Sequence, residues 1–298
     1  MAMPQTGIFA LGNLSHAYLE FDLLDATQPS ALVRAVAGLS EPRTTMGGVN
    51  LVAGFRPGLW ASAAASRAPS GLHDFEVEVV GPDGFAMPAT QHDLVLWVAG
   101  GSFDVVFDAA QGMIEKLRES TQLADEVEGW SYHRDLDLTG FIDGTENPSL
   151  SSAPADVLVP HGQPGAGGSV LLIQKWVHDF AAWSSLSREK QEQVIGRTKP
   201  DSVELDPRPE DSHVARTDQD EFGHILRRNT AYGSVRDHGT VFVGFCSSQT
   251  PLSAMLESMA GAQGTRDALT LYSKPLTGAY YFVPSLDDLE VFAPPPVE

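Results

Sequence analysis

The sequence contains little cysteine, few basic residues and no long apolar run. Its single cysteine, Cys246, cannot form an intrachain disulfide, and its neighbours in VFVGFCSS indicate a small buried core residue rather than a nucleophile. Lys and Arg number 19 against 39 Asp and Glu, a formal net charge of −20 that would repel nucleic acid and anionic membrane surfaces. No stretch reaches the roughly 18 apolar residues that a membrane span requires. We therefore expect no nucleic-acid partner and no membrane association.

Motifs of several enzyme classes are also missing. HExxH, a Cys/His cluster, a Walker-type glycine loop and a nucleophile elbow do not occur, which argues against zinc hydrolases and phosphate-binding enzymes. The start, MAMPQTGIFALGN, lacks a basic n-region and a long apolar h-region, so we expect a cytoplasmic protein. Seven of the nine histidines suit surface or capping roles: His16, His73, His92, His133, His161, His178 and His238.

The chain has 298 residues, of which 42% are hydrophobic, so it can bury a substantial core. Its apolar periodicity predicts the order strand, helix, strand, strand, helix twice. Such a repeat fits a duplicated ferredoxin-like α+β unit, each with an antiparallel sheet covered on one face by helices. The expected strands are 16–24, 49–60 and 92–101, then 167–179, 224–233 and 239–248; the expected helices are 28–40, 103–120, 187–198 and 253–262.

A Pro/Gly/Ser-rich segment separates the two predicted halves. We divide the chain into an N-terminal ferredoxin-like half over 1–148, a linker over 149–168 and a C-terminal ferredoxin-like half over 169–298. The N-terminal half ends in the turn GFIDGTENP, and the linker is long enough to be a surface feature with a role of its own.

The turn TGFIDGTENP, residues 139–148, holds ionisable side chains between residues that favour turns. Asp143 and Glu146 lie among Gly140, Gly144 and Pro148. From these residues alone, the Asp143 carboxylate either accepts hydrogen bonds from nearby amides in an Asx-turn or is presented for chemistry.

The segment HILRRN contains an arginine and an amide at strand spacing. Alternation places Ile225, Arg227 and Asn229 on one face of the predicted strand and the residues between them on the other. Arg227 and Asn229 could both donate hydrogen bonds to a small bound oxygen species. The alternative is an ordinary exposed edge strand.

GFIDGTENP, followed by DSHVAR and then ILRRNTAYG, resembles the dye-decolourising peroxidases, in particular their compact cytoplasmic P-type (class B) members. The resemblance covers essentially the whole chain. It implies a dimeric α+β barrel built from duplicated ferredoxin-like halves, with antiparallel sheets and helices packed outside. It also implies a haem peroxidase with one haem b per chain, which reduces hydrogen peroxide and oxidises dyes, phenols or other small reductants in one-electron steps.

The resemblance also suggests a role for individual residues. His213 matches the proximal histidine that ligates the haem iron. Asp143 matches the distal aspartate that moves a proton of peroxide, and Arg227 and Asn229 match the distal arginine and its amide neighbour. The implied catalytic residues are Asp143, Arg227 and Asn229, and the implied cofactor-binding residues are His213, Asp143, Gly144, Thr145 and Arg227.

Two further residues are weaker candidates. Arg197 could reach a haem propionate or, equally, the carbonyl groups of a helix end. Asp267 could accept a hydrogen bond from the imidazole of the proximal histidine. Apolar side chains that could wall the cofactor, or simply form core, are Phe242, Phe245, Met255 and Met259.

An alternative function on the same fold is a haem-binding, haem-transfer or iron-release protein with incidental peroxidase activity. The presence of Asp143, Arg227 and Asn229 together favours the enzyme, because a haem carrier does not require groups for proton transfer. We further expect a homo-oligomer. The tail ends in FAPPPVE without a Gly/Leu/Ile-rich docking extension, so we expect no packaging in an encapsulin-type nanocompartment.

Overall fold

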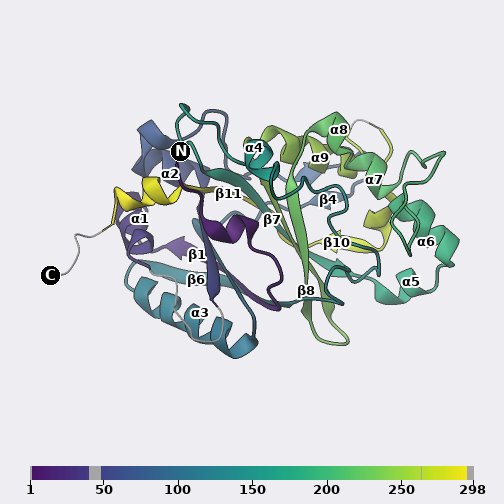
Figure 1. Cartoon of the computed structure of the whole chain (residues 1–298), viewed down its shortest axis with the longest axis horizontal. Helices are drawn as coiled ribbons and strands as arrows, with labels where there is room; N and C mark the ends of the chain where they lie inside the picture. The colour runs from purple at the N-terminus through teal and green to yellow at the C-terminus, as the bar shows by residue number, and fades with distance from the viewer. Residues whose placement is uncertain (1, 40–47, 263, 294–298) are drawn as a thin grey trace.

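The computed structural model describes residues 2–39, 48–262 and 264–293 (Figure 1). Its N-terminal part contains the strands β1 (Ser15–Leu23), β2 (Val49–Phe55), β5 (Leu94–Gly100) and β6 (Thr121–Trp130). These strands pair antiparallel in the order β2-β5-β1-β6, and the helices α1 (Pro29–Ala37) and α3 (Phe103–Leu117) connect them. Strand order and connections are those of a ferredoxin-like unit.

The C-terminal part repeats this arrangement. Its strands β7 (Ser169–His178), β8 (Leu226–Gly233), β9 (His238–Cys246) and β11 (Ala279–Val283) pair antiparallel in the order β8-β9-β7-β11. The helices α6 (Arg188–Ile195) and α9 (Thr250–Ala260) lie in the two crossover connections. A short strand, β10 (Ser273–Pro275), pairs with β7 beside β11. The duplicated ferredoxin-like fold predicted from the sequence is confirmed.

Two short contacts join the units into a closed ring of strands. β6 pairs with β8 through Gly129 opposite Tyr232 and Trp130 opposite Ala231. On the other side, β11 pairs with β2 through Phe282 opposite Phe55. Closing the ring leaves few unpaired sheet edges. α1 and α3 pack outside the first sheet, and α9 lies against the face of the second sheet that carries the cavity described below (Figure 1).

The remaining elements are short. They are η1 (Thr6–Phe9), α2 (Pro57–Ala63), η2 (Ala65–Arg67), β3 (Val79–Val80), β4 (Ala86–Met87), α4 (Ala153–Val157), α5 (Phe180–Ser184), α7 (His213–Arg216), α8 (Gln219–Phe222), η3 (Ala268–Leu271) and α10 (Leu286–Glu290).

The sequence-based prediction missed several strands and misplaced one boundary. The closing strand of each unit, β6 and β11, was not predicted, nor were the short strands β3, β4 and β10. The strand expected over 49–60 ends at Phe55, because Pro57 occupies the first turn of α2, where its missing N–H costs nothing. The linker over 149–168 contains α4, and its side chains Ala153 and Val157 are fully buried.

Single-residue predictions had mixed outcomes. Cys246 is buried and free, as expected. The surface role expected for His16 is wrong, since this residue is 8% exposed in β1. The surface role is also wrong for His178 in β7. Burial of this side chain lowers the pKa of the imidazole to about 4.

No helix among the described residues is long and apolar enough to cross a membrane. The expectation about the C-terminal docking extension concerns residues 294–298, which lie outside the described residues.

Candidate active site

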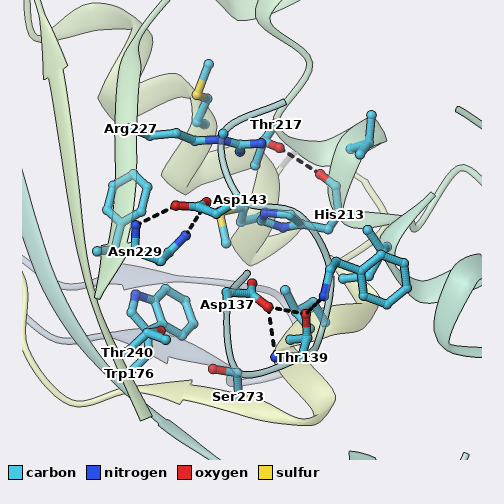
Figure 2. A pocket seen from close by; sticks show the side chains of 18 of the residues that line it. Asp137, Thr139, Asp143, Trp176, His213, Thr217, Arg227, Asn229, Thr240 and Ser273 are labelled. Atoms are coloured by element: carbon cyan, nitrogen blue, oxygen red, sulfur yellow. Dashed lines mark hydrogen bonds between the residues drawn. The ribbon is translucent and has the colours of Figure 1, made fainter. Parts of the chain in front are cut away.

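A cavity of about 1150 Å³, a volume that includes space open to solvent, lies against the outer face of the C-terminal sheet. Alternate side chains of β7, β8 and β9 form its floor, and α7, α9, η3 and the turn 139–148 form its walls. Figure 2 shows Asp143, Arg227, Asn229 and His213 together in one part of this cavity. Residues from both predicted halves therefore meet at one site.

The turn 139–148 bends through two glycines with left-handed backbone. Gly140 has φ of +81° and Gly144 has φ of +71°, a region that other residues rarely adopt. At Gly144 a Cβ atom would also lie 2.5 Å from Nδ2 of Asn147. Glycine here lets the Asn147 side chain fold back across the turn.

Two side chains of this turn bind the backbone of β8. Asp143 accepts hydrogen bonds from both donors of Asn229: its Oδ2 from the backbone N–H at 2.8 Å and its Oδ1 from Nδ2 at 2.9 Å. Asn147 accepts from the backbone N–H of Arg227 at 2.9 Å and donates to the Arg227 carbonyl at 2.8 Å. The Asp143 carboxylate is thus held by a distant strand rather than by local amides.

Arg227 extends into the cavity beside Asp143 (Figure 2). The Asp143 carboxylate accepts its two hydrogen bonds from Asn229, and the Arg227 Nε is buried without a hydrogen-bond partner among the described residues. The guanidinium charge can therefore act on a ligand. The neighbouring Arg228 points to the opposite face of β8 and lies 5.3 Å from the centre of the Trp97 ring, as strand alternation predicts.

His213 begins α7, on the other side of the cavity. Its Nδ1 is 2.7 Å from Oδ2 of Asp267, whose side chain is fully buried at the start of η3. A carboxylate can only accept this hydrogen bond, so Nδ1 carries the proton and Nε2 remains available to a ligand. Asp267 is itself fixed, because its Oδ1 accepts from the Leu269 N–H at 2.8 Å. The acceptor suggested by the sequence is thus in place.

Arg197 also lines the cavity and contacts the central turn. Its Nη2 is 2.8 Å from Oε1 of Glu146, and its Nη1 donates to the Ser202 carbonyl at 2.8 Å. Within the described chain, the Arg197 Nε and the Glu146 Oε2 are buried without partners. The alternative of an exposed arginine bound to helix-end carbonyls is wrong, since the Arg197 side chain is only 15% exposed and the carbonyl that it binds, Ser202, lies beyond the end of α6. The propionate role stays a prediction.

These residues fit a haem. The cavity has a mainly apolar surface with a few polar groups set within it, as is usual for cofactor sites. It offers one oriented imidazole nitrogen, and the described residues contain no group of three side chains that could hold a bare metal ion. A porphyrin brings four nitrogen ligands of its own, so a single protein ligand is sufficient. The unpaired Nε of Arg197 can bind a carboxylate such as a propionate.

The structure brings every predicted site residue to this cavity. Asp143, Gly144, Thr145, His213, Arg227 and Asn229 all line it. Of the four apolar candidates, Phe242, Met255 and Met259 line the cavity, whereas Phe245 lies in the core enclosed by the ring of strands.

Sequence reasoning missed several residues of this cavity. Asp137, Gln174, Trp176, His178, Thr240 and Ser273 also line it. Asp137 Oδ1 accepts from both the N–H and the hydroxyl of Thr139. Burial raises the pKa of the Asp137 carboxyl to about 6, although these hydrogen bonds act in the opposite direction. The one available signal was Gln174, a polar residue directly after the apolar run 170–173 of the predicted strand.

Family models match most of the chain. The model described as "Dyp-type peroxidase, N-terminal" matches residues 18–131, and the one described as "Dyp-type peroxidase, C-terminal" matches residues 134–288. The turn with Asp143 falls within the second match.

Individual proteins show the same similarity. The dye-decolorizing peroxidase of Mycobacterium tuberculosis is 37% identical over 279 residues, which cover 90% of this chain and 81% of that protein. A variant of Rhodococcus jostii DypB, solved in complex with heme, is 33% identical with a TM-score of 0.85 and covers 96% of this chain and 97% of that one. A deferrochelatase of Yersinia pestis is 25% identical over 64% of this chain and 53% of its own length.

Proposed function

Since this chain belongs to the Dyp-type peroxidase family and is a haem peroxidase, we propose that it reduces hydrogen peroxide in the cavity between His213 and Asp143. Dyes, phenols or other small molecules supply the electrons one at a time. One observation carries this proposal. A histidine with a fixed tautomer and a set of three polar side chains line one cavity.

Haem b, one per chain, would supply the iron at which peroxide is reduced and would hold the oxidising equivalents. His213 would bind it through Nε2, and Asp267 keeps the imidazole in the required tautomer and orientation. Arg197 would bind a carboxylate of the cofactor through its free donor. Gly144 and Thr145 line the cavity where the central turn approaches it.

Asp143 is the proposed proton carrier. Cleavage of peroxide requires a proton to leave one oxygen and reach the other, and a carboxylate in the cavity can accept and return it. The two hydrogen bonds from Asn229 fix the direction of this carboxylate, so it does not have to reorient for each transfer. Asn229 therefore acts by positioning Asp143.

Arg227 is the proposed source of positive charge. Negative charge grows on the departing oxygen as the peroxide bond breaks, and a fixed guanidinium stabilises it. Asn147 holds the backbone of Arg227 at both N–H and carbonyl, which limits how far the side chain can drift.

The haem-transfer or iron-release alternative is not favoured. Its named relative, the Yersinia deferrochelatase, is less similar than the dye-decolorizing peroxidases. A carrier would also have no need for the Asp143, Asn229 and Arg227 arrangement.

Mixing the haem-loaded ferric protein with one equivalent of peroxide tests the proposed function. We expect a fast shift of the Soret band that a phenol then reverses. Slow bleaching of the band without a distinct shift would instead support iron release.

Two properties stay predictions from the sequence. We propose a homo-oligomer, which light scattering on the purified protein will check. We also propose a cytoplasmic location, which fractionation of the source cells will check.

A further inference from the structure

We propose that Arg228, on the face of β8 turned away from the cavity, is a positioning residue for peroxide cleavage: its positive charge keeps the Asp143 carboxylate ready to accept a proton. This inference rests on the proposed function, because it concerns how the proton carrier of that reaction is kept in its charged form. Arg228 is not one of the residues that line the cavity, so it would act through Asp143.

The Asp143 carboxylate binds at the edge of β8. Its Oδ2 accepts the backbone N–H of Asn229 at 2.8 Å, and the backbone N–H groups of a strand point sideways, in the plane of the sheet. Side chains of successive residues leave this plane in opposite directions, so Arg227 lies on the cavity side of the edge (Figure 2) and Arg228 on the other side. The strand therefore carries one arginine on each side of the edge at which Asp143 binds.

Uncharged groups hold the Arg228 guanidinium. Its Nη2 donates to the carbonyl of Ile8 in η1, and the guanidinium lies 5.3 Å from the centre of the Trp97 ring. The Arg228 Nε is buried without a hydrogen-bond partner, and no carboxylate of the described residues forms an ion pair with this side chain. A charge without an anion in contact acts on anions further away, because protein surroundings screen it less than water does.

The charges of Arg228 and Asp143 stabilise each other. Burial lowers the pKa of Arg228 to about 10, while the charges of Tyr18 and Asp143 act in the opposite direction. The guanidinium is therefore positively charged throughout the neutral range. Because the interaction between two charges is mutual, Arg228 favours the ionised form of Asp143 as much as Asp143 favours the charged form of Arg228.

Side chains of the N-terminal half fix Arg228 from behind. Trp97 Nε1 donates to Nδ1 of His16 at 3.1 Å, and the rings of Trp97 and Tyr18 are stacked with their centres 5.7 Å apart. The Tyr18 hydroxyl donates to Oγ1 of Thr230 at 2.8 Å, on the same face of β8 as Arg228. Burial, together with the Arg228 charge, lowers the pKa of the His16 imidazole to about 4, so His16 adds no second positive charge at neutral pH.

Other ionisable groups act on the same carboxylate or on its neighbour. They are Arg227 on β8, Glu146 in the same turn with its partner Arg197, His213 on α7, Asp137 in the segment before the turn, and Lys199, whose charge acts on Asp137. Burial raises the pKa of Asp137 to about 6, and the Asp143 charge adds to this rise, so the two carboxylates oppose each other's ionisation. Arg228 offsets this repulsion from outside the cavity, which leaves Arg227 free to act on peroxide.

The pH dependence of the reaction tests the proposal. Stopped-flow rates of the Soret shift with peroxide are measured from pH 4 to 8 for the haem-loaded ferric protein, Arg228→Met and Arg228→Lys. Without the positive charge Asp143 is protonated more readily, so we expect the acid side of the Arg228→Met profile to move up by about one pH unit, the lower end of the effect of one nearby opposite charge. On the acid side this corresponds to a loss of about tenfold in rate, whereas the rate at pH 8 should stay close to that of the unsubstituted protein. Arg228→Lys keeps the charge and should leave the profile in place.

Two further variants sharpen this test. Arg228→Gln also removes the charge but retains a donor for the Ile8 carbonyl, and it should give the same shift as Arg228→Met. Arg236→Met makes the same chemical change at an exposed position after β8 and should leave the profile unchanged. Haem content and melting temperature verify that each variant is folded and loaded. A purely structural role of Arg228 would slow the reaction equally at every pH.

A double-mutant cycle measures the interaction without the reaction. The midpoint of urea unfolding at pH 7 is compared for the haem-loaded ferric protein with and without Arg228→Met, and again with both in the Asp143→Asn background. Arg228→Met should be more destabilising in the unsubstituted protein than in the Asp143→Asn background, because the two charges interact only where both are present.

An acid side that stays in place in both Arg228→Met and Arg228→Gln, or that moves as far in Arg228→Lys, would overturn the role of the Arg228 charge. Equal changes of the urea midpoint in the two backgrounds would overturn it as well. The Soret shift of the unsubstituted protein with peroxide tests the proposed function separately. A normal shift combined with an unmoved acid side therefore refutes only the present inference.

Discussion

Replacing Arg227 and Asp143 in turn should separate charge stabilisation from proton transfer. Arg227→Ala removes a guanidinium whose Nε has no partner in the described protein, so its charge is free to act on peroxide. Two unit charges about 4 Å apart interact with an energy of about 4 kcal/mol at an effective dielectric constant of about 20. Loss of one oriented electrostatic donor typically slows catalysis by about 10²–10³-fold. We therefore expect Arg227→Ala to slow the reaction with peroxide by roughly 10²-fold or more.

Asp143→Ala should slow the reaction less, because water or a small added base can replace part of a proton carrier. The same change leaves the N–H and Nδ2 of Asn229 without their acceptor, which costs about 1–3 kcal/mol of stability per unsatisfied group. It should also change the pH dependence of the rate and leave haem bound through His213.

Stopped-flow absorbance of the Soret band after mixing with peroxide, from pH 4 to 8, provides the rates. The rate of Asp143→Ala is measured with and without formate, to test whether a small base restores the reaction. Arg236→Ala, at an exposed turn after β8, is the control for Arg227→Ala and should react at the unsubstituted rate. If neither active-site substitution changes the rate more than a few-fold, both assignments are wrong and iron release gains support. If Asp143→Ala is the more damaging, proton transfer dominates and the order of the two roles is reversed.

Further substitutions test how the cofactor and the turn are held. His213→Ala should give a folded protein with little or altered haem, and an unchanged haem spectrum would exclude His213 as the ligand. Asp267→Asn should weaken haem retention about 10–100-fold in transfer to apomyoglobin, since it removes the charged partner of Nδ1. Asn147→Ala removes two hydrogen bonds and should cost about 1–3 kcal/mol, read as a lower melting temperature. Limited proteolysis should cut the linker 149–168 first, at its exposed residues, and a first cut within β8 would contradict the division into halves.

The strands that sequence could predict are those whose apolar residues face a core. β7 and β9 are buried along most of their length, and each contains a run of at least four apolar or glycine residues. β6, with the sequence TQLADEVEGW, alternates buried and exposed residues and has too few apolar side chains to be recognised. β11 is short, at five residues. Both of these strands make the contacts between the two units, so they depend on tertiary pairing.

The site was predictable where its residues fall in one motif or on one strand face. Arg227 and Asn229 share a face by simple alternation, and the structure has them both in the cavity. Asp137 and Gln174 could not be connected from sequence, because one lies in a loop and the other in a strand of the opposite half. Only the packing of the central turn over the sheet brings them into one cavity.

The central turn connects the fold to the chemistry through the free edge of β8. β6 pairs with β8 only near Ala231 and Tyr232, so the backbone groups of Arg227 and Asn229 on that edge have no neighbouring strand. Asp143 and Asn147 bind these groups instead. A buried strand edge without such partners would be costly, and filling it with another strand would cover the cavity. The carboxylate is therefore held in place by the same hydrogen bonds that complete the sheet. This explains why a short glycine-bent turn, rather than a continuation of the pairing between β6 and β8, occupies this position.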